Sequence, residues 1–184
     1  MKAPPKQLLV FDRKFAMPSK HTFTIKPIKE LLAEEVGLNN IGWADPFAGW
    51  NSPAFYTNDL NPDAPTTYHM KAEEFATVAP DELEGVLFDP PYSPRQISEN
   101  YKGIGLSVGM KETQSGALYK RVKDAFAPKI KTGGKVICCG WNSMGFGINR
   151  GFQIERILLV PHGGGHYATI VTVERKIQAD FLEQ

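Results

Sequence analysis

The sequence has few cysteines and no long apolar run. Its 184 residues include two cysteines, the adjacent pair Cys138 and Cys139, which suit neither a disulfide framework nor a zinc site. No segment approaches the roughly 18 uninterrupted apolar residues of a membrane-spanning helix, and residues 1–5 lack the apolar stretch of a signal peptide. These absences disfavour secreted, membrane-spanning and zinc-binding proteins, so we expect a cytoplasmic protein with no metal and no membrane partner.

The sequence also lacks a large net charge, although its charges are unevenly distributed. The formal net charge is +1. Residues 31–84 hold ten acidic residues and one basic residue, residues 85–135 hold nine basic and four acidic residues, and residues 2–29 hold seven basic residues and one acid. A polyanion could bind such a basic side. Uneven charge around a soluble surface also explains the pattern, so charge alone does not identify a partner.

Length and composition indicate a single domain over residues 1–184. The 42% of hydrophobic residues can supply a core, and no internal repeat or low-complexity linker divides the chain. Residues 1–19 are expected to form an irregular N-terminal arm, in which residues 7–11 could add a short strand. An early proline, a shared apolar face and a following glycine predict a helix over residues 27–36. A second helix is predicted between residues 113 and 130.

Seven short apolar runs have the length of strands. They span residues 41–44, 54–57, 67–70, 85–88, 135–140, 153–160 and 168–173. The fourth and fifth runs are apolar without alternation, which favours strands buried on both faces of a mostly parallel sheet. The last two runs are joined by the glycine-rich segment 162–166, a hairpin-like connection, so the last strand is expected to be antiparallel. The predicted fold class is α/β, in three layers.

The strongest functional signal is Asp89-Pro90-Pro91-Tyr92, directly after the fourth run. Open α/β sheets bind ligands at the carboxyl ends of their strands. Two prolines fix the backbone and remove two N–H donors, so this loop can present a carboxylate, free carbonyl groups and an aromatic ring together. Asp89 and the Pro90 carbonyl could accept both hydrogens of a planar exocyclic amine while Tyr92 stacks on its ring. For the isolated string, a simple proline turn is the alternative.

Four motifs, in order along the chain, resemble those of S-adenosylmethionine-dependent amino-methyltransferases. They are His21–Ile28, in which Lys-Pro opens a helix, the Asp-Pro-Phe-Ala-Gly segment Asp45–Gly49, the segment Asn58–Pro62, and Asp89–Tyr92. The resemblance covers residues 21–175 and is most specific to the phage-type N6-adenine DNA methyltransferases. It implies a Rossmann-like methyltransferase fold with a mostly parallel seven-stranded sheet, an antiparallel last strand and S-adenosylmethionine as the cofactor.

The same resemblance implies roles for individual residues. The catalytic residues would be Asp89, Pro90, Pro91 and Tyr92. The cofactor-binding residues would be Asp45, Pro46, Phe47, Ala48, Gly49, Asp59, Thr22, Lys26 and Pro27, with Glu73 or Glu74 on the adenine side of the cofactor. The substrate-binding residues would be Arg95, Tyr101, Lys102, His166 and Tyr167. Taken singly, Asp59 could be a turn residue, and the segments that hold the substrate-binding residues could be ordinary surface loops.

The sequence departs from the family pattern around the cofactor motif. Thirteen residues separate Asp45 from Asp59, and a parallel crossover normally needs about a dozen residues in its connection alone. The first crossover helix is therefore predicted to be absent or shortened to a turn near residues 51–53. Trp50 and its neighbour stand where the family has a second glycine. No separate target-recognition domain is visible, so residues 94–116 would have to read the substrate, and a homodimer that shares the DNA is compatible with this.

The resulting hypothesis is methyl transfer from S-adenosylmethionine to the N6 amine of adenine in DNA. The base would be turned out of the duplex, because the amine cannot be reached inside the stack. Two alternatives stay open. Methylation of an RNA base would need neither base flipping nor a recognition domain. A non-catalytic methyltransferase-like subunit would bind nucleic acid or a partner chain; the shortened crossover favours it, whereas the intact Asp-Pro-Pro-Tyr motif favours the enzymes.

Overall fold

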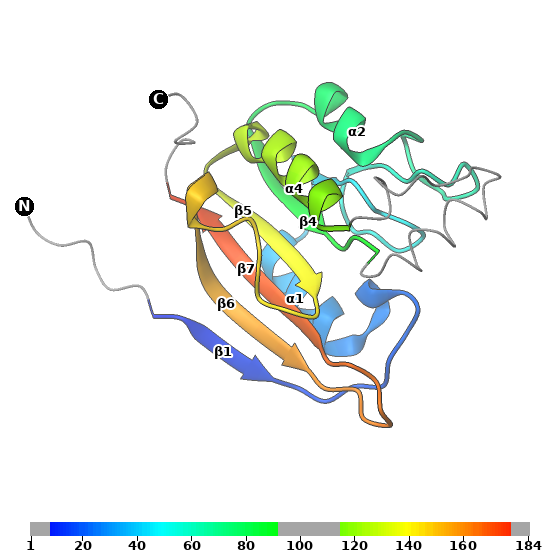
Figure 1. Ribbon diagram of the computed structural model, residues 1–184, viewed down its shortest axis with the longest axis vertical. Helices are drawn as coiled ribbons and strands as arrows, with labels where there is room; N and C mark the ends of the chain where they lie inside the picture. The colour runs from blue at the N-terminus through cyan, green and yellow to red at the C-terminus, as the bar shows by residue number, and fades with distance from the viewer. Residues whose placement is uncertain (1–7, 92–114, 178–184) are drawn as a thin grey trace, which may run out of the picture.

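A seven-stranded sheet forms the middle layer of the molecule in the computed structural model, which describes residues 8–91 and 115–177 (Figure 1). Its strand order is β1-β6-β7-β5-β4-β2-β3. The strands are β1 (Val10–Arg13), β2 (Trp43–Asp45), β3 (Tyr56–Thr57), β4 (Leu83–Phe88), β5 (Ile130–Gly140), β6 (Phe152–Val160) and β7 (Thr169–Lys176). The α-helices are α1 (Lys26–Val36), α2 (Ala72–Val78) and α4 (Ser115–Phe126), and the short 3-10 turns are η1 (Thr22–Thr24), η2 (Ala127–Lys129) and η3 (Ile148–Arg150).

The direction of the strands matches the prediction. β7 is antiparallel to both of its neighbours, β5 and β6, and the other pairs in the sheet are parallel. Phe88 at the end of β4 pairs with Cys138 in β5, and Gly140 at the end of β5 pairs with Ile170 near the start of β7. The segments that follow β4 and β5 and the segment that precedes β7 therefore reach the same edge of the sheet, which we call the carboxyl edge.

Helices cover both faces of the sheet, as Figure 1 shows. Val86 and Phe88 pack with α2 and α4 on one face, whereas Leu87 between them packs with α1 on the other. β5 divides its residues between the two cores in the same way. The absence of alternation in these two strands is thus explained by burial on both sides, and the three-layer α/β prediction is confirmed.

Helix boundaries follow local sequence signals. α1 has proline in its first turn and ends at Gly37, whose φ of 71° is a conformation that glycine adopts without strain. The predicted second helix is α4, and its apolar residues Leu118, Val122 and Phe126 are buried. No described helix is long and apolar enough to cross a bilayer.

Three local predictions were wrong or incomplete. The run at residues 67–70 is not a strand but makes one isolated parallel bridge, between Asn58 and Tyr68. The Asn58 side chain bonds both the N–H and the carbonyl of Met70, so it occupies groups that a strand partner would have used. The seventh strand is instead β1, which begins three residues and ends two residues later than the strand expected in the N-terminal arm, and the short helix α2 was not predicted.

The connection from β2 to β3 contains no helix. Ten residues, 46–55, lead from Asp45 to Tyr56, and they form turns. β2 and β3 nevertheless pair in parallel, with Asp45 opposite Thr57. The prediction of a shortened first crossover is confirmed, and the helix is lost entirely.

Candidate functional site

A cavity of about 370 Å³ lies at the carboxyl edge, beside the ends of β2, β3 and β4. Its size is within the range of small-molecule sites, about 300–1,000 Å³. Several predicted site residues line it together, namely Thr22, Pro46, Phe47, Ala48, Gly49, Asp59, Glu73, Asp89, Pro90 and Pro91. Residues from five separate segments of the chain therefore meet at one place.

Asp45 is not in the wall of this cavity but beneath it. Its side chain is fully buried, and one carboxylate oxygen accepts the Phe47 N–H at 2.9 Å while the other accepts the Ser52 hydroxyl at 2.6 Å. Burial raises the pKa of Asp45 to about 7, and the nearby charges of Asp89 and Asp59 add to this, while the two hydrogen bonds oppose it. The structure thus places Asp45 as a residue that shapes the loop after β2.

Asp59 fixes the same loop from the next strand. Its carboxylate accepts the Gly49 N–H at 3.0 Å and the Asn61 N–H at 2.8 Å. Gly49 has a φ of 52°, in the left-handed region where a side chain would be strained. Unlike Asp45, Asp59 is only partly buried and lines the cavity, so its remaining acceptor positions can reach a ligand.

Asn58 is a site residue that the sequence analysis did not identify. It is fully buried, and its side-chain amide donates to the carbonyls of Pro46 and Met70 at 3.1 and 3.0 Å, while its oxygen accepts the Met70 N–H at 3.1 Å. Its own carbonyl accepts the Ala48 N–H at 2.9 Å. Asn58 therefore joins the loop after β2 to the segment that leads into α2. The only signal in the sequence was its place just before Asp59 in a matched motif.

The structure separates the predicted cofactor residues into two groups. Glu73 lines the cavity and is paired with Arg121 at 3.6 Å, whereas Glu74 is exposed and does not line it. In the segment before α1, Thr22 lines the cavity, but Lys26 and Pro27 do not. Lys26 is exposed and Pro27 is buried in the first turn of α1, so both act on the cavity only through the position of that helix.

A second cavity, of about 970 Å³, lies on the other side of the loop after β4. Pro90 lines both cavities, whereas Asp89 and Pro91 line the first and Phe88 lines the second. The second cavity is also bounded by Tyr119 of α4 and by the segment 140–150 after β5. The Asp89–Pro91 loop thus forms a wall between two spaces.

Two charged side chains, the buried Glu174 and the partly buried Lys123, hold the segment after β5 against this wall. Glu174 accepts the N–H groups of Phe146 and Gly147, and Lys123 donates to the carbonyls of Met144 and Gly145 at 3.0 and 2.6 Å. Burial raises the pKa of Glu174 and lowers the pKa of Lys123.

The clamped segment supports the residue that precedes Asp89. The Phe146 ring meets the Phe88 ring edge-on, with centroids 5.6 Å apart, and the Lys123 ammonium lies 5.3 Å from the Phe88 ring centre. Phe88 is buried, and Phe146 is almost wholly so. This packing restricts where Phe88, and with it the adjoining loop, can lie.

The predicted substrate-binding residues have different outcomes. His166 and Tyr167 are exposed at the carboxyl edge and line neither cavity. Tyr167 lies against Trp141, with ring centroids 5.2 Å apart, and Trp141 lines the second cavity. Four predicted residues lie outside the described part of the chain: Tyr92, Arg95, Tyr101 and Lys102.

Comparisons with known proteins identify the fold. No family model matches the chain, and no curated protein matches it. Among solved structures, yhhF from Escherichia coli, a provisionally assigned methyltransferase, matches with a TM-score of 0.53 and 11% identity over 88% of this chain and 92% of its own. A provisionally assigned hemolysin from Streptococcus thermophilus matches with a TM-score of 0.50 and 12% identity, over 83% of this chain and 66% of its own.

A third solved structure, TrmN from Thermus thermophilus, matches with a TM-score of 0.46 and 16% identity. The match covers 93% of this chain but only 44% of TrmN, so this chain spans less than half of that protein. At these identities the likeness concerns the fold alone. The chain has the Rossmann-like fold of methyltransferases, with a mostly parallel seven-stranded sheet and an antiparallel β7.

Proposed function

We propose that this protein transfers a methyl group from S-adenosylmethionine to the N6 amine of adenine in DNA. The observation that carries the proposal is the position of the Asp89–Pro91 loop, which separates a small-molecule cavity from a second, larger one and lines the first with its carboxylate. Methyl transfer needs its two reactants to be held on either side of the groups that orient them, because much of the acceleration comes from positioning. A loop that borders two cavities offers that arrangement.

The charges of the first cavity fit the proposed cofactor. Three carboxylates, those of Asp59, Glu73 and Asp89, line it together with Lys20 and Lys71. S-adenosylmethionine carries two cationic groups and one carboxylate, so both signs of charge find partners. When bound, it supplies an electrophilic methyl group on a sulfonium centre. Asp59 would accept hydrogen bonds from the ribose hydroxyls, and Glu73, which also lines the cavity, would contact the adenine.

The loop after β2 disfavours the main competing ligands, the phosphate-containing nucleotides. Sites for these ligands offer free backbone N–H groups at the start of a helix. Here no helix follows β2, and the N–H groups of Phe47, Ala48 and Gly49 are bonded to Asp45, Asn58 and Asp59. A ligand without phosphate is therefore favoured.

The chain's own groups can orient the amine. The Asp89 carboxylate and the Pro90 carbonyl would accept the two amine hydrogens, which directs the nitrogen lone pair towards the cofactor side of the loop. Phe146, whose N–H donates to Glu174, packs against Phe88 and so restrains the loop that follows it. Asp89 in the first motif position resembles the N6-adenine enzymes, which is why we favour adenine.

Methylation of an RNA base is the second candidate. One observation favours it: the aromatic pair Trp141 and Tyr167 is exposed at the carboxyl edge, where it could stack on bases that are already unpaired. Both candidates use the same cavities and the same Asp89 chemistry, so they differ only in the nucleic acid that is bound.

The test is nucleoside mass spectrometry after incubating the protein and S-adenosylmethionine with unmethylated DNA or RNA. We expect N6-methyladenine in the DNA with the wild type and with Asp63→Ala, because Asp63 is an exposed acid that lines neither cavity. Asp89→Ala should lose at least about 100-fold in turnover, the loss typical when a positioned catalytic group is removed. Calorimetry should show that Asp89→Ala still binds S-adenosylmethionine.

The other outcomes have equally definite meanings. Methylated bases in RNA alone would replace the first candidate with the second. Turnover by Asp89→Ala equal to wild type would remove the assignment of Asp89. A wild type that binds no S-adenosylmethionine would refute both enzyme proposals and leave the non-catalytic subunit.

A further inference from the structure

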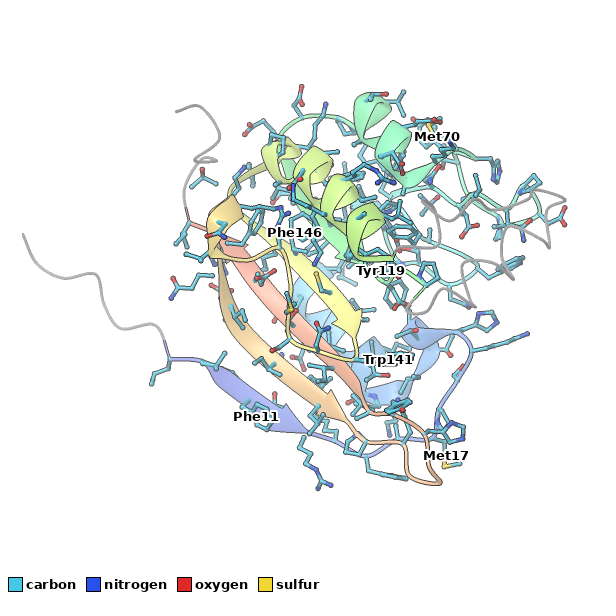
Figure 2. All side chains as sticks on the ribbon, viewed as in Figure 1. Phe11, Met17, Met70, Tyr119, Trp141 and Phe146 are labelled. Atoms are coloured by element: carbon cyan, nitrogen blue, oxygen red, sulfur yellow. The ribbon has the colours of Figure 1, made fainter. Side chains whose placement is uncertain are left out.

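We propose that the N-terminal arm from Arg13 to His21 and the β6–β7 loop, residues 161–168, form one surface that binds the unpaired nucleotides next to the target base. This inference rests on the proposed function, because it names how the substrate reaches the same site. Figure 2 shows Met17 of the arm at the end of the sheet where β6 and β7 are joined, and Trp141 at the same end. We call the arm and the loop together the edge surface.

Hydrogen bonds hold the arm in a fixed path. β1 runs parallel to β6, and the pairing continues past its end, where the N–H groups of Lys14 and Ala16 donate to carbonyls at the end of β6 at 3.0 and 3.2 Å. His162 then locks the arm to the loop. Its buried ring has Nδ1 2.8 Å from the Ala16 carbonyl and Nε2 2.8 Å from the Thr169 hydroxyl. A carbonyl only accepts, so Nδ1 is the donor.

Beyond Ala16 the arm reaches the first cavity. Lys20, His21 and Thr22 line that cavity. The arm therefore leads continuously from the β6–β7 loop to the wall of the proposed cofactor site. A chain bound along the arm would be directed towards the reaction.

Large apolar side chains are exposed along this path. Phe15 is 65% exposed, Met17 is 72% exposed, and Tyr167 is 77% exposed. The Phe15 ring lies over Gly163, where an added Cβ would be 3.3 Å from it. Phe15 and Tyr167 thus present aromatic rings at two ends of the same loop, and exposed aromatic groups that cluster in this way mark binding surfaces.

The edge surface also carries charge of one sign. Residues 13–21 include three lysines and arginines, and neither this segment nor residues 161–168 contains an aspartate or glutamate. Lys14 makes a long pair of 3.5 Å with Glu30, in which both side chains are nearly half exposed. Such a pair is weak and does not neutralise the surface.

This combination favours a nucleic acid strand over a second copy of the protein. Basic groups that follow a backbone and aromatic rings that stack on successive bases are how proteins hold single strands. A symmetric dimer through this surface would bring the basic arms of both copies into one interface, and repulsion between like charges would oppose it. Stacked base pairs of an intact duplex would offer no ring faces to Phe15 and Tyr167, whereas unpaired bases would.

The experiment is fluorescence anisotropy with a labelled adenine-containing 20-nucleotide DNA strand, the same RNA strand and the matching DNA duplex. We expect Phe15→Ala and Tyr167→Ala each to weaken single-strand binding by roughly 5- to 100-fold, the effect of losing one stacked base. Lys14→Gln should reduce the slope of log affinity against log salt by about 0.7. The matched controls are Leu38→Ala and Lys131→Gln, which lie at the opposite end of the strands and should change neither quantity.

The outcomes separate this inference from the proposed function. Weaker strand binding in the three edge variants supports the edge surface even if no methylated base is found. Methylation by a wild type whose strand binding is unchanged in all three variants overturns the edge surface and leaves the proposed function standing. Sedimentation that shows a wild-type dimer lost in Phe15→Ala and Tyr167→Ala would overturn it in favour of a second copy.

Discussion

Replacing Asp45 with asparagine tests the role that the structure gives to this residue. Asparagine has nearly the same shape, so it can still accept the Phe47 N–H, and the Ser52 hydroxyl can turn to accept rather than donate. What the substitution removes is the ionisable group. Burial raises the pKa of Asp45 from 3.8 to about 7, so near neutral pH the folded protein holds a carboxyl that is partly protonated.

The magnitude follows from the two pKa values. Between pH 3.8 and about 7 the folded protein binds more protons at Asp45 than the unfolded chain does, so the free energy of unfolding falls as the pH rises. The contribution of Asp45 is fully present below pH 3.8 and is lost as the pH passes through about 7. The pKa of Asp45 differs by about 3 between the folded and unfolded chain, and each pKa unit corresponds to about 1.4 kcal/mol, so Asp45 contributes roughly 4 kcal/mol to the free energy of unfolding at low pH. About 2.5 kcal/mol of this contribution is lost between pH 5 and pH 8.

Urea unfolding at several pH values measures this directly. We expect the stability of Asp45→Asn relative to the wild type to rise by about 2.5 kcal/mol from pH 5 to pH 8, with no change in the slope against urea. Asp63→Asn is the control, because Asp63 is exposed and should keep the wild-type pH dependence. Parallel pH profiles for Asp45→Asn and the wild type would refute the reasoning, because they would mean that Asp45 ionises normally inside the fold.

Three further predictions concern the walls of the two cavities. Gly145→Ala should lower the free energy of unfolding by about 1–3 kcal/mol in urea, since its Cβ would overlap the Glu174 carboxylate; an unchanged midpoint would show that the clamp is loose. Asn58→Ala should lower the free energy of unfolding by about 2–4 kcal/mol and weaken S-adenosylmethionine binding in calorimetry, because the backbone groups of Pro46 and Met70 lose their hydrogen bonds to Asn58. Glu73→Gln should weaken that binding about tenfold and Glu74→Gln should not; equal effects would contradict the placement of Glu73.

The sequence predicted most of the architecture, because burial patterns are local. Continuous apolar runs placed β4 and β5 inside the sheet, and the three buried residues of α4 were identified from their spacing. α2 was missed because seven residues contain only three buried positions, which is too short a pattern to distinguish from a loop. The composition of residues 67–70 predicts a strand, but the Asn58 side chain bonds the N–H and the carbonyl of Met70, a contact that composition does not reveal.

The site was predictable as a set of segments but not as a set of contacts. Residues 22, 46–49, 59, 73 and 89–91, which the sequence analysis selected, line one cavity. The motifs could not show that Asp45 points inward, because its partner Ser52 is seven residues away in a loop with no regular structure. Nor could they distinguish Glu73 from Glu74, since the difference depends on the rotation of α2 against α4.

The missing first crossover helix explains why these contacts are needed. A helix after β2 would hold its own backbone and leave free N–H groups at its start. Without one, the backbone after β2 has to be held from outside, and the side chains of Asp45 and Asp59 and the backbone of Asn58 accept its first N–H groups in turn. Two of these acceptors, Asn58 and Asp59, directly follow β3, so the segment after the neighbouring strand bonds the N–H groups that a helix would otherwise have held. Asp59 also lines the cavity, so this part of the wall presents a carboxylate in place of free N–H groups, which favours a cationic ligand over a phosphate.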